Sequence, residues 1–171
     1  FLPILAAGRM DSDSGVWRGR FAIAEVAHGR SLGSADVSQS FETGQGEARI
    51  TASDLVFDPE GLQPGDVLPM AQSLAARASG RASFEGQASW SSSGVASQGV
   101  LRVGGISFSS PAGRVTGLRT ETRFTSLAPM TTEAGQTLTA DRLEWLITLG
   151  DLKAAYAVAP TFVQIESAGA S

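Results

Sequence analysis

The stretch GVLRVGGISFSSPAGRVTGLRTETRFTSLAPMTTEAGQTLTADRLEWLITLG, residues 99–150, decides the fold class of this sequence. Apolar residues recur in it at every second position, between short clusters of Gly, Pro and Ser. Successive side chains of an extended backbone point to opposite sides, so this period indicates β-strands. We predict strands over residues 99–108, 113–125 and 137–149, and a loop without strand over residues 126–136.

Strand patterns also precede this stretch. Residues 15–27 and 35–43 alternate, and residues 47–57 change phase halfway, which indicates a β-bulge. Residues 80–91 are the clearest amphipathic strand, because one side is entirely polar and the other carries Ala82, Phe84, Gly86, Ala88 and Trp90. In residues 99–108 the alternation assigns Leu101 and Val103 to one side of the sheet and the opposite side to Val100, Ile106 and Phe108.

The chain of 171 residues fits one domain or a slice of a larger one. We expect residues 1–14 to be a tail or the end of a preceding strand, residues 15–167 a single β-sheet domain, and residues 168–171 a cut end. One helix is predicted, over about residues 67–78, where apolar residues recur at helical spacing after Asp66, a suitable N-cap.

The sequence therefore predicts a mostly β protein, an extended antiparallel sheet that is curved and twisted, with one short helix. A helix of about three turns covers only a few strands of so wide a sheet. The rest of the apolar side must close onto itself or line an open groove. Both alternatives stay open at this point: a closed β-sandwich serving as a binding or adhesion module, and an open sheet that holds an apolar guest.

The composition excludes several classes of function. A net charge of −4 from 13 basic and 17 acidic residues argues against nucleic-acid binding, which needs a clustered positive excess. The chain has no Cys and a single His, His28, so no zinc ligand set is recognisable, and we expect His28 to be an exposed turn residue. No run approaches the roughly 20 apolar residues that span a bilayer. We predict no enzyme, no metal and no cofactor.

Five short segments share a further pattern of Gly, Pro and apolar positions: GRASFEGQASW (80–90), GISF (105–108), GRVTGL (113–118), FTSLAP (124–129) and GQTL (135–138). With LQPGDVLPMAQSLAARASGR (62–81) before them, they make about residues 53–167 resemble the YdbH-like family. The GQTL element is the most distinctive part, and Ala134 precedes it where the family pattern would have Pro.

The resemblance implies an AsmA-like, TamB-like bridge protein of the Gram-negative envelope. Such a protein is anchored in the inner membrane through a segment absent from this chain and crosses the periplasm as a β-groove. The apolar floor of the groove conducts phospholipids between the inner and outer membrane, without catalysis. The implied partners are phospholipid acyl chains, neighbouring strands of the same longer chain, and both membranes through other parts of it.

If the chain is a slice of such a groove, large apolar side chains should line it. We expect this lining to consist of Phe84, Trp90, Phe108, Phe124 and Trp145. A hydrolase is the third alternative after the groove and the closed sandwich, and it lacks a recognisable pair of nucleophile and base.

Overall fold

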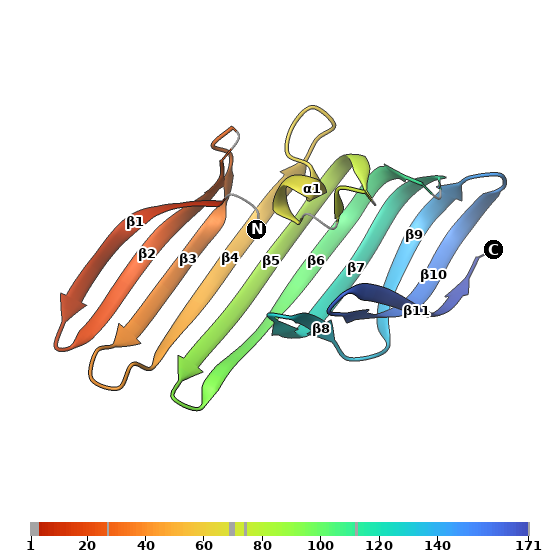
Figure 1. Ribbon diagram of the computed structural model, residues 1–171. Coiled ribbons are helices and arrows are strands. Elements are labelled where there is room, and N and C mark those ends of the chain that lie inside the picture. Colours follow the sequence, from red (N-terminus) through yellow and green to blue (C-terminus); the bar gives the residue numbers. More distant parts are fainter. Residues whose placement is uncertain (1–3, 27, 69–70, 74, 112, 171) are drawn as a thin grey trace.

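The computed structural model describes residues 4–26, 28–68, 71–73, 75–111 and 113–170. It consists almost entirely of strands, with one short helix, α1 (Pro64–Val67) (Figure 1). The strands are β1 (Ile4–Asp13), β2 (Val16–Glu25), β3 (Ser31–Ser40), β4 (Gly46–Phe57), β5 (Ala76–Ser91), β6 (Gly94–Ser110), β7 (Gly113–Leu127), β8 (Met130–Thr132), β9 (Gln136–Glu144), β10 (Thr148–Ala159) and β11 (Phe162–Gly169).

All described strands belong to one antiparallel sheet of 11 strands. Its hydrogen-bonded order follows the chain from β1 to β7 and continues through β9, β10 and β11, while β8 pairs with the end of β7. The sheet is open, so β1 and β11 each have one neighbouring strand within the described residues. The predicted curved, open antiparallel sheet is confirmed. The alternative of a closed sandwich is wrong for the described chain, since no second sheet covers the first.

Two predictions in the C-terminal half are wrong in detail. The strand expected over residues 137–149 is two strands, because the chain reverses at residues 145–147, where the Trp145 N–H donates to the Ile147 carbonyl at 3.1 Å. The loop expected over residues 126–136 contains β8. β9 pairs with β7 only from Arg114 to Thr120. The C-terminal residues of β7, from Phe124 to Leu127, pair with β8 instead.

Within the helical span predicted over residues 67–78, the Ala75 N–H donates to the Ala71 carbonyl at 2.9 Å, as in one helical turn. The helix α1 is short, as expected, but it shares only Val67 with that span. It begins at Pro64 and ends at Val67, and β5 begins at Ala76; of the predicted span, residues 69–70 and 74 lie outside the described residues. Asp66 is not the N-cap but the third helical residue, and its Oδ2 accepts a hydrogen bond from the Gln63 N–H at 2.8 Å. A proline suits the first turn because its missing N–H has no partner there.

Bulges decide which side chains share a side of the sheet. The phase change predicted in residues 47–57 is confirmed as a register shift between Ala52 and Leu55 of β4. A second shift lies between Gly104 and Ile106 of β6, where the double glycine indicates a bend or a bulge. It inserts Gly105, whose φ of 82° favours glycine, and reverses the alternation.

Because of this second bulge, the division predicted for residues 99–108 is wrong. Leu101 and Val103 pack against the same core cluster as Ile106 and Phe108, instead of lying on the opposite side. The core cluster is small and lies on one side of the sheet only. Its buried members are Leu32, Ala52, Leu55, Phe57, Leu62, Ala78, Ala82 and Ile106.

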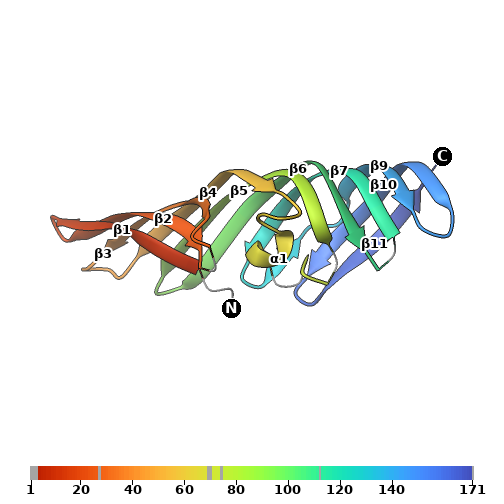
Figure 2. The same cartoon turned by 90° about the horizontal axis from the view of Figure 1, so that it is seen from above.

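The sheet is bent as well as twisted. Seen from above in Figure 2, the middle strands form the top of an arch, and α1 lies beneath them. The helix α1 lies on the side of the sheet that carries the core cluster, since its Val67 packs against that cluster. The bend and the helix make the two faces of the sheet different in shape.

Candidate functional site

Strand β5 defines the two faces of the sheet, because its side chains alternate without interruption from Arg81 to Trp90. The apolar face carries its Ala82, Phe84, Gly86, Ala88 and Trp90, as predicted. The register places Ala52 of β4 and Leu101 of β6 beside Phe84 on this face. The polar face is the opposite one, with Arg81, Ser83, Glu85, Gln87 and Ser89 of the same strand.

On the apolar face, aromatic rings lie over glycines of their own or adjacent strands. A methyl group placed at Gly86 would meet the Phe84 ring at 2.8 Å, and one at Gly99 would meet it at 3.1 Å. The Trp90 ring lies in the same way over Gly46 of β4, its cross-strand neighbour. Rings that lie against glycine backbone do not stand up from the sheet, so they leave a low apolar surface beside them.

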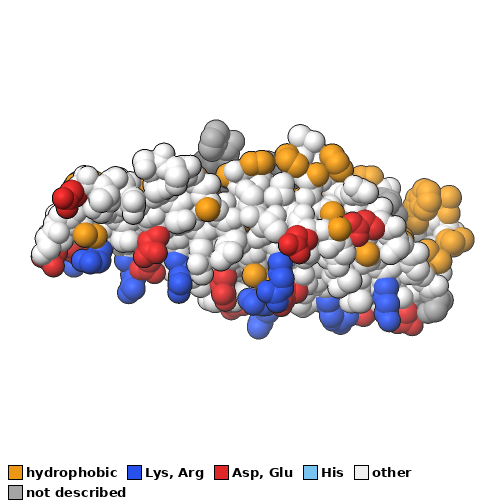
Figure 3. Space-filling view, turned by 90° about the horizontal axis from the view of Figure 1, so that it is seen from below, with side chains coloured by type: hydrophobic (Ala, Val, Ile, Leu, Met, Phe, Trp, Pro, Cys, Tyr) orange, Lys and Arg blue, Asp and Glu red, His pale blue; other side chains and the backbone are white. Residues whose placement is uncertain are grey.

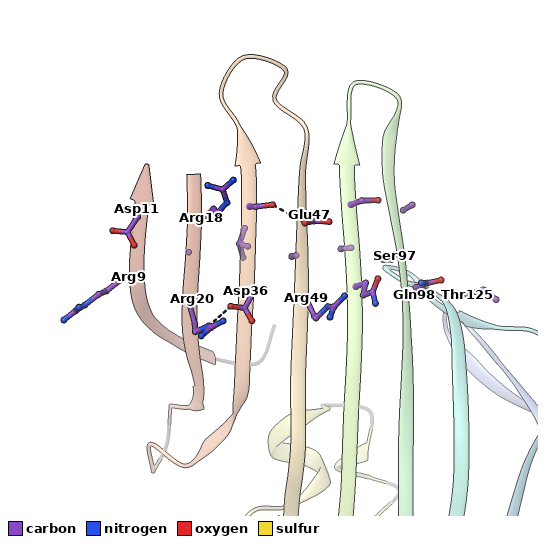
Figure 4. A pocket seen from close by; sticks show the side chains of 18 residues that line it. Arg9, Asp11, Arg18, Arg20, Asp36, Glu47, Arg49, Ser97, Gln98 and Thr125 are labelled. Atoms are coloured by element: carbon purple, nitrogen blue, oxygen red, sulfur yellow. Dashed lines mark hydrogen bonds and ion pairs between the residues drawn. The ribbon is translucent and has the colours of Figure 1, made fainter. Parts of the chain in front are cut away.

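The polar face concentrates the charges of the molecule. Figure 3 shows Lys, Arg, Asp and Glu side chains along one long side of the molecule and hydrophobic side chains along the other. A shallow hollow of about 960 Å³ lies on the polar face over β1 to β7 (Figure 4). Its charged lining residues are Arg9, Asp11, Arg18, Arg20, Asp36, Glu47 and Arg49. A hollow of this chemistry suits water and ions, not an acyl chain.

Ion pairs join the charges of the polar face, some between neighbouring strands and some within one strand. Glu121 pairs with Arg102 at 3.2 Å and also with Arg123. Arg119 Nη1 lies 2.6 Å from Asp141 Oδ1, and this hydrogen bond is the main cause that lowers the pKa of the Asp141 carboxyl. These pairs are exposed to water, where each contributes little to stability.

Four of the five expected lining residues lie on the apolar face. Phe84 and Phe108 pack against the core cluster, Trp90 covers Gly46, and Phe124 pairs with Gly99 in the register of β6 and β7. Trp145 lies apart from them, in the turn between β9 and β10. It is 66% exposed there, and the two residues after it, Leu146 and Ile147, are 82% and 65% exposed.

A buried polar cluster on the apolar face has no counterpart in the sequence predictions. Tyr156 of β10 places its hydroxyl 2.9 Å from Thr120 Oγ1 and 2.5 Å from Thr122 Oγ1, both on β7. Since β9 lies between β7 and β10 in the sheet order, this contact reaches across a strand and joins β7 directly to β10. No sequence signal could have found it, because the threonines and the tyrosine are 34 to 36 residues apart.

The described residues offer no metal centre, since no group of three or more His, Cys, Asp or Glu side chains is arranged to hold an ion. His28 is an exposed turn residue, as predicted, and its Nδ1 lies 3.1 Å from Glu25 Oε1. Within the same part of the chain, no helix has the length and hydropathy required to cross a membrane.

Comparison with known proteins identifies the family. The model of the YdbH-like family, described as intermembrane phospholipid transport protein YdbH, matches residues 3–168, nearly the whole chain. No curated protein and no solved structure matches the chain. An open β-sheet with one apolar face fits a family whose cargo is a phospholipid. The chain belongs to the YdbH-like family of intermembrane phospholipid transport proteins.

Proposed function

We propose that this chain is one segment of a periplasm-spanning protein that conducts phospholipids between the inner and outer membrane along the apolar face of its sheet. The observation that carries the proposal is the contrast between the two faces of an open sheet. One face is charged and hydrated, while the other presents large apolar side chains that no second sheet covers. A contiguous exposed apolar surface needs an apolar partner, and the family supplies the phospholipid.

The proposed transport is non-catalytic sliding. Acyl chains lie on Phe84, Trp90, Phe108 and Phe124, while headgroups stay in water at the open side. Trp145 contacts lipid only at the rim, since it lies in a turn outside the face. The Phe84 ring and the Leu127 side chain both lie over Gly86 and Gly99, so the path is lined by apolar groups there. Transfer along such a surface exchanges one apolar contact for an equal one and has no large barrier.

The proposed partners beyond the lipid are further strands at both edges of the sheet. All ten residues of β1 and all eight of β11 are exposed, and each strand pairs on one side only. An exposed edge strand presents free N–H and C=O groups, which pair readily with another strand. Neighbouring strands of the same longer chain, anchored in the inner membrane, would continue the groove in both directions.

Native mass spectrometry of the protein, purified gently from a bacterial envelope extract, tests this function. We expect co-purified phospholipid with the native chain and its loss in Phe84→Asp and Phe108→Asp, because a carboxylate on the path makes contact with an acyl chain unfavourable. Ser83→Asp is the matched control, since it adds the same charge to β5 on the polar face.

Circular dichroism must first show that the Asp variants keep the native strand content. Folded Phe84→Asp and Phe108→Asp proteins that carry as much lipid as the native protein would show that the apolar face is not the path. If the native protein is detected only at the mass of the polypeptide, without bound phospholipid, the proposed function is refuted.

A further inference from the structure

The connection between β4 and β5 lies on the apolar face and covers part of it. Leu62, in the first half of this connection, is only 6% exposed and belongs to the core cluster. There it packs with Leu55 and Phe57 of β4 and with Ile106 of β6. Figure 2 shows the same arrangement, with α1 beneath the arch of the middle strands. The connection therefore covers the apolar face at this end of β4 to β6 and leaves the same face open farther along these strands.

A single side chain, Gln63, fastens this connection to the sheet. Its Nε2 donates to the Ala78 carbonyl at 3.1 Å, and its Oε1 accepts from the Ala78 N–H at 2.8 Å. The same Nε2 donates to the Asp58 carbonyl at 2.5 Å, which ties the start of the connection to its middle. It also donates to the Leu62 carbonyl at 3.2 Å, so one amide contacts four backbone groups.

The Gln63 amide takes the place of a missing strand. The pairing of β4 with β5 ends at Phe57 and Gly80, so the Ala78 backbone has no partner from β4. Ala78 is completely buried, and a buried backbone N–H and C=O must be paired. A primary amide offers one donor and one acceptor side by side, which matches both groups of one residue. An apolar residue lacks the donor and the acceptor, and a shorter residue does not reach Ala78, so neither can replace Gln63.

We propose that the connection formed by residues 58–68, 71–73 and 75 is a wall of the lipid path, and that Gln63 is the positioning residue that holds this wall on the apolar face. This inference rests on the function proposed above. Acyl chains are confined to the part of the face that the wall leaves open, where Phe84 lies half-buried. They do not reach Phe57, which is 7% exposed beneath the wall.

Site-specific photocrosslinking in the full-length protein distinguishes the two regions. Phe57 and Phe84 form a matched pair: both are phenylalanines of adjacent strands, and both face the same side. A diazirine-bearing phenylalanine at each position is irradiated in envelope membranes labelled with a radioactive phospholipid precursor. We expect a lipid adduct at position 84 and none above background at position 57. Equal amounts of lipid adduct at both positions would refute the proposal that the connection is a wall. No adduct at either position would count against the proposed function itself.

The role of Gln63 is tested in the same assay. Gln63→Leu keeps the volume of the side chain but removes all four hydrogen bonds of the amide, so the wall should lift and an adduct should appear at position 57. Gln72→Leu is the control, because it makes the same exchange at an exposed position of the connection. An adduct at position 57 that stays at background in folded Gln63→Leu would show that Gln63 does not hold the wall. If that variant does not fold, the native pattern at positions 57 and 84 still decides whether the wall exists.

Discussion

The contact between Tyr156 and the two threonines of β7 allows a quantitative test of how β7 is joined to β10. Tyr156 is 6% exposed and Thr122 is 3% exposed, so their hydroxyls have no access to bulk water. Thr120 Oγ1 also donates to the Thr137 carbonyl at 2.8 Å and keeps that partner without Tyr156. Thr122 Oγ1 has the Tyr156 hydroxyl as its hydrogen-bond partner among the described residues.

The magnitude follows from these partners. Tyr156→Phe removes the hydroxyl and leaves Thr122 Oγ1 buried and unpaired, which costs about 1–3 kcal/mol of the free energy of unfolding. Thr122→Val leaves the Tyr156 hydroxyl paired with Thr120, so its cost should be smaller, about 1 kcal/mol. In the double variant neither hydroxyl is left unpaired at this contact. Its total cost should therefore be less than the sum of the two single costs, with a coupling of about 0.5–3 kcal/mol.

Urea unfolding, followed by circular dichroism and by tryptophan fluorescence, measures all four proteins of the cycle. Thr125→Val is the control, since this threonine bonds Thr131 at an exposed position and its loss should change stability by no more than about 0.5 kcal/mol. Costs of Tyr156→Phe and Thr122→Val that add within about 0.5 kcal/mol would refute the reasoning. β7 and β10 would then be joined by the backbone pairing through β9 alone.

Two further predictions concern the backbone and the charges. Gly33 has a φ of 149°, and a methyl group there would overlap the Thr51 carbonyl of β4. Gly29 has a φ of 69° in open surroundings, so Gly29→Ala should cost only the backbone strain, about 1–2 kcal/mol. Gly33→Ala should therefore lower the stability measured in urea by more than Gly29→Ala does. Equal midpoints for these two variants would contradict the close approach of β3 to β4. The Arg119 hydrogen bond lowers the pKa of Asp141, so this carboxylate stabilises the fold above its unfolded-state pKa, and the stabilisation is lost as the pH falls through the folded-state pKa. The urea midpoints of the native protein and Asp141→Asn should thus differ slightly near neutral pH and converge at about pH 2, and a difference that persists in acid would contradict this assignment.

The strands and faces were predictable where the alternation runs without interruption. In β5 every second residue from Ala82 to Trp90 is small or aromatic, and this period alone fixes which side each residue occupies. In β6 the same reasoning is wrong beyond Gly105, since one inserted residue reverses the alternation. The double glycine at residues 104–105 was the available signal, because glycine within a strand often marks a bulge.

The helix shows the opposite case, in which strand pairing in the folded protein overrides a local helical pattern in the sequence. Residues 67–78 have helical spacing, but Ala76 and the residues after it gain backbone hydrogen bonds by joining β5. Among the described residues, α1 occupies only the turn that Pro64 begins, and one further helical hydrogen bond joins the Ala75 N–H to the Ala71 carbonyl. Since a helix this short has little stability of its own, packing and pairing decide where it ends.

The sequence by itself determined an antiparallel β protein with one charged and one apolar face, because side chains alternate with a period fixed by the extended backbone. Only the tertiary structure decided that the sheet stays open, that Gln63 closes one end of the apolar face, and that Tyr156 reaches across β9 to Thr122. These contacts join residues 15 to 34 positions apart, and nothing in the local pattern encodes them. They depend on how a twisted sheet bends, and that bend results from bulges and long-range pairing acting together.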